Sequence, residues 1–383
     1  MKTNKSGILV LFFGVLSVLL VFSYGYIDPN LTLSTNPVFL HIQEPLKNLA
    51  YHQRQVATIL FFAILIVLFF CYVIFLKNQE KLFYSWKKTL LILSMSAVIL
   101  VLSYPALTYD LFNYILTAKV TYQYHENPYI VMPIEIPNEP NLAFTRAANK
   151  VALYGPVWIL LTAIPNYVGG GNVWRTIIAF KLMNAMVYVG FSYFIYRVTK
   201  NLTNVIFFAL NPLVLIEVLM NGHNDIYMMM LALGGLILWQ KKGLGNMITG
   251  DLALFASWWV KGATVILAPL LFLKNISWER ILFIAYCLLS FIFFVVAPIR
   301  EELYPWYAVW LVMTASLLPF KSHRYLLGFT IALTFALELR NLPYMWMGYY
   351  EGPGPLLRTL LTVVSVGTYI SYLGIRYVLT KRK

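Results

Sequence analysis

Long apolar segments without any charged side chain recur along the chain and constrain its fold more than any other feature. Residues 56–76 contain 21 consecutive uncharged residues, and a helix needs about 20 mostly apolar residues to cross a bilayer. Only 11% of the chain is charged and 60% is hydrophobic, whereas soluble domains have about 25% charged residues. The sequence therefore excludes a soluble globular enzyme, a disordered protein and a disulfide-stabilised secreted scaffold.

These segments predict an all-α, polytopic transmembrane bundle of about twelve spans (11–13), forming a single integral-membrane domain over residues 1–383. The stretch 247–273 is interrupted near Lys261, so we interpret it as two short helices that meet there. The other predicted spans are 7–26, 56–76, 88–104, 174–196, 202–219, 225–240, 280–298, 306–320, 324–340 and 356–378. Residues 174–320 are expected to supply the core helices.

The basic residues indicate how the bundle is oriented. More than half of the 29 lysines and arginines lie in alternate loops and at the two ends, and cytoplasmic loops are enriched in these residues. They are Lys2 and Lys5, Lys77, Lys81, Lys87 and Lys88, Arg197 and Lys200, Lys241 and Lys242, Lys274 and Arg280, Lys321 and Arg324, and Lys381, Arg382 and Lys383. We expect both termini in the cytoplasm and interpret the net charge of +14 mainly as an orientation signal rather than as a nucleic-acid surface.

With this orientation the longest polar segments face outward. Residues 105–173 form the first and largest outer region, in which 152–168 is apolar but broken by Pro156 and Pro165. We interpret that segment as an interfacial or re-entrant helix; a true span is the alternative. The inner loops are short and basic and contain no phosphate-binding glycine motif. Any chemistry is therefore expected at the outer membrane–water boundary.

Asp110 directly follows a predicted span and has aromatic and apolar neighbours. If residues 108–124 form a helix, Asp110, Asn113 and Tyr114 share one face with Thr117. A partly desolvated carboxylate has a pKa moved toward neutrality, which suits a general base. The alternative is an acidic residue that only stabilises the start of a helix.

The densest polar cluster between two spans is Asn221-Gly222-His223-Asn224-Asp225. Polar groups within or close to the membrane are energetically costly and therefore indicate a functional site. The alternative is a polar turn in which Asp225 caps the next helix. Sugar hydroxyl recognition suits these side chains better than a metal, because two ligands are a weak metal signal. Glu217 lies one turn away and needs a partner that the sequence does not identify.

Three further features accompany these clusters. Lys261 lies among apolar residues and either reaches toward the interface or holds an anion such as a lipid phosphate. Arg300 precedes two glutamates, which favours a solvated charge cluster. The run from Tyr304 to Tyr307 is typical of an interfacial aromatic belt, and its rings also suit stacking on sugars or prenyl chains.

Together these motifs resemble the GT-C superfamily of polytopic glycosyltransferases, and most closely the bacterial polyprenol-phosphate-mannose-dependent mannosyltransferases. The matching features are Asp110 with Tyr114 and then Asn127-Pro128-Tyr129, Tyr154-Gly155-Pro156, Asn211-Pro212 followed by the 221–225 cluster, and Tyr304-Pro305-Trp306-Tyr307. The resemblance implies transfer of a hexose such as mannose from a polyprenyl-phosphate carrier to a glycan or glycolipid acceptor. It also implies inversion at the sugar and an Asp110 general base, in a cell-membrane enzyme with its site on the extracytoplasmic face.

On this reading the leaving phosphate is balanced by Lys261, Arg146 or Arg300, and neither a cofactor nor a metal is expected. The expected substrate-binding residues are Asn113, Tyr114, Asn127, Tyr129, Tyr154, Asn221, His223, Asn224, Asp225, Trp306 and Tyr307.

Two other functions remain open at this point. A transporter or flippase of lipid-linked saccharides would show internal repeats and functional groups at mid-membrane. No repeat is evident, and the titratable residues gather toward one face, which favours the enzyme. A non-catalytic assembly subunit is the third possibility, because each motif is short.

Overall fold

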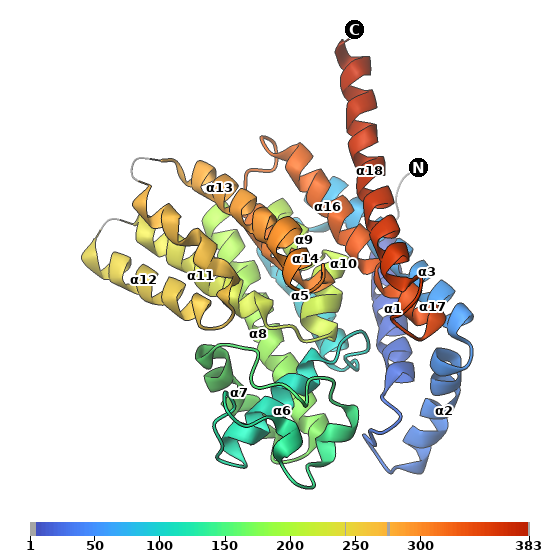
Figure 1. Ribbon diagram of the computed structural model, residues 1–383. Coiled ribbons are helices and arrows are strands. Elements are labelled where there is room, and N and C mark those ends of the chain that lie inside the picture. The colour runs from blue at the N-terminus through green and yellow to red at the C-terminus, as the bar shows by residue number, and fades with distance from the viewer. Residues whose placement is uncertain (1–4, 242, 274–275, 382–383) are drawn as a thin grey trace.

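The computed structural model describes residues 5–241, 243–273 and 276–381, and helices are the only regular secondary structure within them (Figure 1). The predicted all-α architecture is confirmed. Lys2, Lys242, Lys274, Arg382 and Lys383, which contribute to the orientation prediction, lie outside the described residues.

The helices fall into long and short groups. The longer ones are α1 (Lys5–Ser23), α2 (Pro37–Tyr51), α3 (Arg54–Lys77), α5 (Trp86–Val101), α6 (Asp110–Tyr122), α7 (Pro156–Gly169), α8 (Val173–Thr199), α11 (Asp225–Gln240), α12 (Leu244–Trp258), α13 (Trp278–Phe291), α16 (Arg324–Glu338) and α18 (Gly354–Lys381). The shorter ones are α4 (Gln79–Leu82), α9 (Leu202–Ala209), α10 (Pro212–Val214), α14 (Ala297–Arg300), α15 (Ala308–Ala315) and α17 (Asn341–Met347). Among the tighter or wider turns are the π-helix η4 (Leu215–Met220) and the 3-10 helices η5 (Gly262–Phe272) and η7 (Pro305–Tyr307).

Six helical segments in the described chain are long and apolar enough to cross a membrane, and a seventh is possible if a bent pair counts as one span. The six are Ser6–Tyr26, Arg54–Lys77, Val173–Thr199, Trp278–Arg300, Arg324–Met347 and Gly354–Leu379; the pair, bent by 51°, is Leu202–Ala209 with Pro212–Met220. The count of about twelve is not confirmed. Helix α5 has 16 residues, or about 24 Å, which is short of the roughly 30 Å hydrocarbon core.

Asparagine and proline define two helix starts. The side chains of Asn36 and Asn211 each accept a hydrogen bond from the backbone N–H two residues later, at 2.9 and 3.0 Å, and the intervening proline has no N–H that would need an acceptor. Pro156 likewise begins α7, whose 14 residues are too few for a straight span. This length agrees with an interfacial or re-entrant helix. The predicted break near Lys261 is confirmed, because α12 ends at Trp258 and η5 begins at Gly262.

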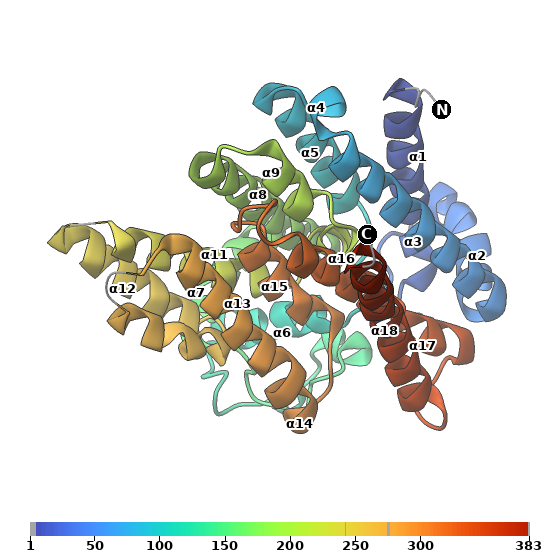
Figure 2. The same ribbon diagram turned by 90° about the horizontal axis from the view of Figure 1, so that it is seen from above.

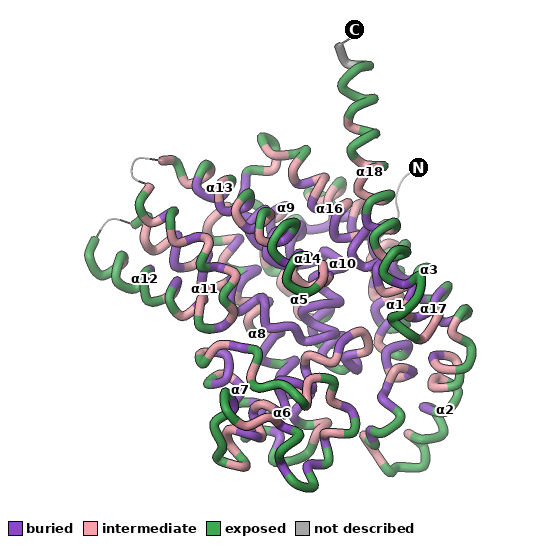
Figure 3. The backbone as a smooth tube through the Cα atoms, viewed as in Figure 1, coloured by how far each residue is buried: buried purple, intermediate pink, exposed green. Residues whose placement is uncertain are grey.

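Helices α6 and α7, with the loops between them, form a lobe at one end of the molecule (Figure 1). Helix α1 begins, and α18 ends, on the opposite side. Seen from above, α11, α12 and α13 form one flank and α1, α2 and α3 the other (Figure 2). The most buried backbone runs through the centre, where α9, α10 and η4 are almost fully enclosed (Figure 3). The two polar clusters of the sequence meet where this centre contacts the lobe.

Candidate functional site

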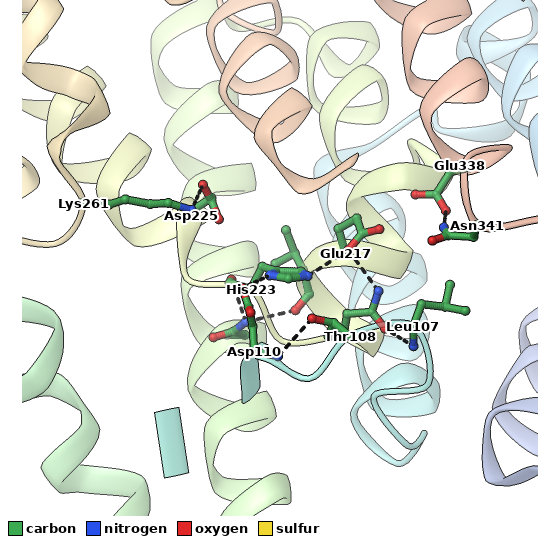
Figure 4. Close-up of polar contacts among 12 residues, drawn as sticks. Leu107, Thr108, Asp110, Glu217, His223, Asp225, Lys261, Glu338 and Asn341 are labelled. Carbon is green, nitrogen blue, oxygen red and sulfur yellow. Dashed lines mark hydrogen bonds and ion pairs between the residues drawn. The ribbon is translucent and has the colours of Figure 1, made fainter. Parts of the chain in front are cut away.

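The predicted helix around residue 110 forms as α6, and Asp110 is its first residue. The Asp110 backbone N–H donates to the Thr108 hydroxyl at 3.0 Å. The Asp110 side chain is 24% exposed, so this carboxylate is reachable. It lies beside His223 (Figure 4). A carboxylate at the start of a helix is also favoured by the helix dipole.

The loop that follows η4 is pressed against the start of α6 at Gly222. This residue has φ +85°, a region that favours glycine. A Cβ added to it would lie 2.4 Å from the Leu111 Cδ1. Glycine therefore meets both a backbone and a packing requirement here. The contact brings the next residue, His223, beside Asp110.

His223 is fully buried and lies between two carboxylates (Figure 4). Its Nδ1 is 3.5 Å from the Asp110 Oδ2, and its Nε2 is 3.1 Å from the Glu217 Oε2. Glu217, whose partner the sequence did not identify, therefore pairs with His223. The Asn221 amide donates to the same Glu217 oxygen at 2.9 Å and accepts from the Leu107 N–H at 3.3 Å.

The neighbouring charges shift the pKa values of both His223 and Asp110. Burial alone would lower the pKa of His223, but the flanking carboxylates of Asp110 and Glu217 outweigh it and raise the pKa to about 9. Desolvation likewise acts to raise the pKa of Asp110, and His223 and Lys261 overcome it, so that this pKa is lowered. The expectation that desolvation moves Asp110 toward neutrality is therefore wrong, because the sequence did not show these two cations beside it.

Lys261 forms a second charged pair at the site. Its Nζ lies 3.0 and 3.2 Å from the two carboxylate oxygens of Asp225, whose side chain is fully buried. The Trp310 indole donates to the same carboxylate at 2.6 Å, and Lys261 also lies over the Tyr307 ring at 4.6 Å. The sequence offered an interfacial lysine or an anion-binding one, and in the structure its direct partner is a protein carboxylate. Asp225 is the first residue of α11, but the expected cap does not form: the N-cap position is Asn224, which makes no side-chain capping bond.

The aromatic run 304–307 packs into this site. The Trp306 ring stacks on His223 with centroids 4.1 Å apart, and Tyr304 stacks on Trp306 at 4.4 Å. Tyr307 stacks on Trp310 at 4.7 Å. These rings therefore pack within the candidate site, in addition to any role in an interfacial aromatic belt.

Helix α7 is docked on the turn that carries Lys261. Gly155 and Val157 donate backbone hydrogen bonds to Val260 and Trp259, at 3.2 and 3.1 Å. A Cβ on Gly155 would lie 2.1 Å from the Trp259 carbonyl oxygen, so only glycine fits this approach. Tyr154 is thereby held near the Asp110 carboxylate, which it helps to keep ionised.

The two predicted substrate-binding residues on α6, Asn113 and Tyr114, are buried. The Tyr114 ring packs edge-on against Tyr154 and Trp158, at 4.8 and 5.0 Å. The Asn113 amide oxygen accepts from the Ala147 N–H at 3.3 Å and ties the lobe's loop to the helix. Asn224 is fully buried, and within the described part of the chain neither its amide oxygen nor its amide nitrogen has a hydrogen-bond partner.

Four of the predicted site residues lie outside the charged cluster, which consists of Asp110, Glu217, His223, Asp225 and Lys261. Asn127 and Tyr129 line an open hollow on the lobe, and the Tyr129 hydroxyl donates to the Tyr154 carbonyl at 2.9 Å. Arg146 lies over the Tyr109 ring at 4.6 Å. The Arg300 side chain is 80% exposed, and its nearest carboxylate is Glu301 at 3.9 Å. The solvated charge cluster expected for Arg300 is thus what the structure shows.

Asn184 is a site residue that the sequence analysis missed. It is fully buried in α8 and donates to the Val218 and His223 carbonyls, at 3.0 and 3.1 Å. The Tyr227 hydroxyl donates to its amide oxygen at 2.8 Å. Asn184 therefore fixes the 221–224 loop. The available signal was an amide in the middle of an apolar span.

A pair of arginines beyond Tyr304 was also missed. Arg340 and Arg358 both donate to the Glu302 Oε1, at 2.7 and 2.5 Å. Arg340 precedes α17 and Arg358 lies in α18, so both are far from Glu302 in the sequence. No sequence spacing links them.

No group of three or more His, Cys, Asp and Glu side chains suited to a metal ion occurs in the described part of the chain. Neither a curated protein nor a solved structure matches the chain. Residues 11–277, well over half of the sequence, match the model of the MptA_B family, described as alpha-(1->6)-mannopyranosyltransferase, N-terminal domain. This match includes Asp110, His223 and Lys261. The chain therefore belongs to this family and is a multi-pass membrane glycosyltransferase that transfers mannose.

Proposed function

We propose that the chain transfers mannose from a polyprenyl-phosphate carrier to a hydroxyl group of a glycan or glycolipid at the outer face of the membrane, with Asp110 as the general base. The observation that carries this proposal is the exposure of Asp110. Its side chain is 24% exposed, whereas Glu217 and Asp225 in the same cluster are 2% and 0% exposed. Asp110 is therefore the carboxylate of this cluster that an acceptor can reach.

In the proposed step the acceptor oxygen forms a bond to the anomeric carbon while the bond from that carbon to the phosphate oxygen breaks. The hydroxyl proton passes to Asp110, and the polyprenyl phosphate leaves with the bonding electrons. The lowered pKa of Asp110 keeps the carboxylate ionised at neutral pH. This base strength is sufficient because the hydroxyl becomes more acidic as its oxygen bonds to carbon.

The proposed transfer inverts the anomeric carbon. A single in-line displacement inverts the anomeric carbon, so an α product requires a β-linked donor. The alpha-(1->6) description of the family therefore supports a β-mannosyl phosphate donor and a primary hydroxyl acceptor at a sugar 6-position.

A cation near the leaving phosphate would stabilise the charge that develops there. Lys261 is the best placed of the three proposed cations, because it is 20% exposed and close enough to Asp110 to lower the pKa of that carboxyl. Arg146 is the second choice and Arg300, which points to solvent, the third. Three buried residues are proposed to hold the sugar site in place from the protein interior: Asn221, Asn224 and Asp225.

The test is Asp110→Asn in purified protein or membranes supplied with polyprenyl-phosphate-linked mannose and a mannose-containing glycolipid, with mass analysis of the products. Loss of a general base costs about 10²–10⁴-fold in rate. Glu44→Gln, an exposed carboxylate on α2, is the matched control and should retain wild-type activity. Full activity of the Asn variant would show that Asp110 is not the base. Flipping of lipid-linked sugar in vesicles without transfer would instead support a transporter.

A further inference from the structure

Both ring nitrogens of His223 face a carboxylate, and this arrangement specifies the protonation state of the ring (Figure 4). A neutral imidazole has a single N–H, so its other nitrogen would direct a lone pair at an anion. The imidazolium has an N–H on each side. Asp110 and Glu217 together therefore suit only the charged ring.

We propose that Glu217 is a positioning residue that holds His223 as an imidazolium, and that His223 in turn holds the Asp110 carboxylate in the orientation that receives the acceptor proton. This inference rests on the proposed role of Asp110. Glu217 is 2% exposed, so it acts through His223 and does not meet a substrate.

The surrounding contacts make this array rigid. Trp306 stacks on the His223 ring with an interplanar angle of 17°, and Tyr304 stacks on Trp306 with an interplanar angle of 9°. An aromatic face also stabilises a cation placed against it. The Asn221 amide donates at 2.9 Å to the same Glu217 oxygen that faces His223, which holds this carboxylate in place beside the ring.

Other charged and titratable groups around the array have their own partners or lie farther out. Lys261 from the turn before η5 and Asp225 from α11 neutralise each other. Glu338 from α16 lies on the far side of Glu217 and contacts Asn341 at 3.5 Å (Figure 4). Tyr154 lies near Asp110, and Tyr304 stacks on Trp306. Asp110 and Glu217 are thus the two anions that meet the ring.

Removing one of these two anions should release the proton. The ring is fully buried, and burial favours its neutral form. With both carboxylates present the pKa of His223 is about 9. With Asp110 alone the balance moves toward the neutral ring, which would then have one N–H to share between orienting Asp110 and any other acceptor.

The experiment measures kcat/KM for mannose transfer as a function of pH in the full-length protein. The wild type should lose activity as pH rises through about 9, where His223 loses its proton. Glu217→Gln should move this basic limb to lower pH by about one unit or more. His223→Gln should abolish the limb, and adding Glu217→Gln to it should cause no further loss, since the two residues act as one unit.

Glu338→Gln is the matched control, because it removes a neighbouring buried carboxylate that does not contact His223, and it should leave the limb in place. A uniform loss of activity in Glu217→Gln, with an unmoved limb, would overturn the positioning role while leaving the proposed function intact. Retained activity in Asp110→Asn would instead overturn the proposed function. If Glu217→Gln is not recovered folded, His223→Gln decides the question, because a limb that persists near pH 9 in that variant contradicts the proposal.

Discussion

Lys261→Met tests how much the ion pair with Asp225 contributes to the stability of the fold. The substitution removes the ammonium group and keeps most of the apolar stem. It leaves the Asp225 carboxylate fully buried, with the Trp310 indole N–H as its remaining side-chain donor at 2.6 Å. An anion in this position has lost water and most of its compensation.

Breaking a buried ion pair by removing one partner costs about 3–5 kcal/mol. We take about 3 kcal/mol, because the Lys261 side chain keeps 20% exposure. The entropy of unfolding is about 2.1 cal/mol/K per residue, or about 0.8 kcal/mol/K over 383 residues. The expected decrease in Tm is therefore about 4 °C.

The assay is thermal unfolding in detergent, followed by tryptophan fluorescence. Adding Asp225→Asn to Lys261→Met should restore about 1–3 kcal/mol, because the amide needs no counter-ion while its oxygen still accepts from Trp310. Arg300→Met is the control for an exposed pair and should change stability by less than about 0.5 kcal/mol. Equal effects of the Lys261 and Arg300 substitutions, or no recovery in the double variant, would refute the reasoning.

Three further outcomes are expected. Gly222→Ala should reduce transfer at least about tenfold in the same mass-based assay, because its Cβ would lie 2.4 Å from Leu111 at a positive φ; unchanged turnover would show that the loop tolerates displacement. Asn184→Leu should lower the free energy of unfolding by about 1–3 kcal/mol, since two buried carbonyls lose their donor; an unaltered Tm would contradict this. The stabilisation that His223 contributes should be complete below its ordinary pKa of 6.5 and disappear as pH rises through about 9; His223→Gln should remove this part of the Tm–pH curve, and an identical curve would exclude it.

Much of the architecture could be predicted because it depends on local composition. The helix at Asp110 and the break at Lys261 follow from short-range signals. The break at Asn211-Pro212 was not expected, because the apolar run 202–219 was interpreted as one span, and the structure divides it into two segments bent by 51°. The number of spans could not be predicted in the same way. Apolarity identifies a buried helix and a membrane span alike, and α5 and α11 are apolar at 16 residues each.

The polar residues at the site were also identifiable, because polar groups beside membrane spans are unusual. Their partners were not. His223 lies 113 positions from Asp110 and still approaches it to 3.5 Å, and the pKa of each group depends on that approach. The expected rise of the Asp110 pKa was wrong for this reason: the sequence indicates an apolar neighbourhood but not the cations within it.

The sequence alone is enough to predict an all-helical membrane protein and to single out Asp110 and the 221–225 cluster as candidate site residues, because apolar segments and the cost of buried polar groups are local properties of the chain. Which charges face one another depends instead on how the helices pack. Glycine at 222 and 155 permits the close contacts that bring His223 to Asp110 and Tyr154 beside the turn of Lys261. Electrostatic interactions act through space, so Glu217, Asn184 and Trp306 acquired their roles only when the helices packed.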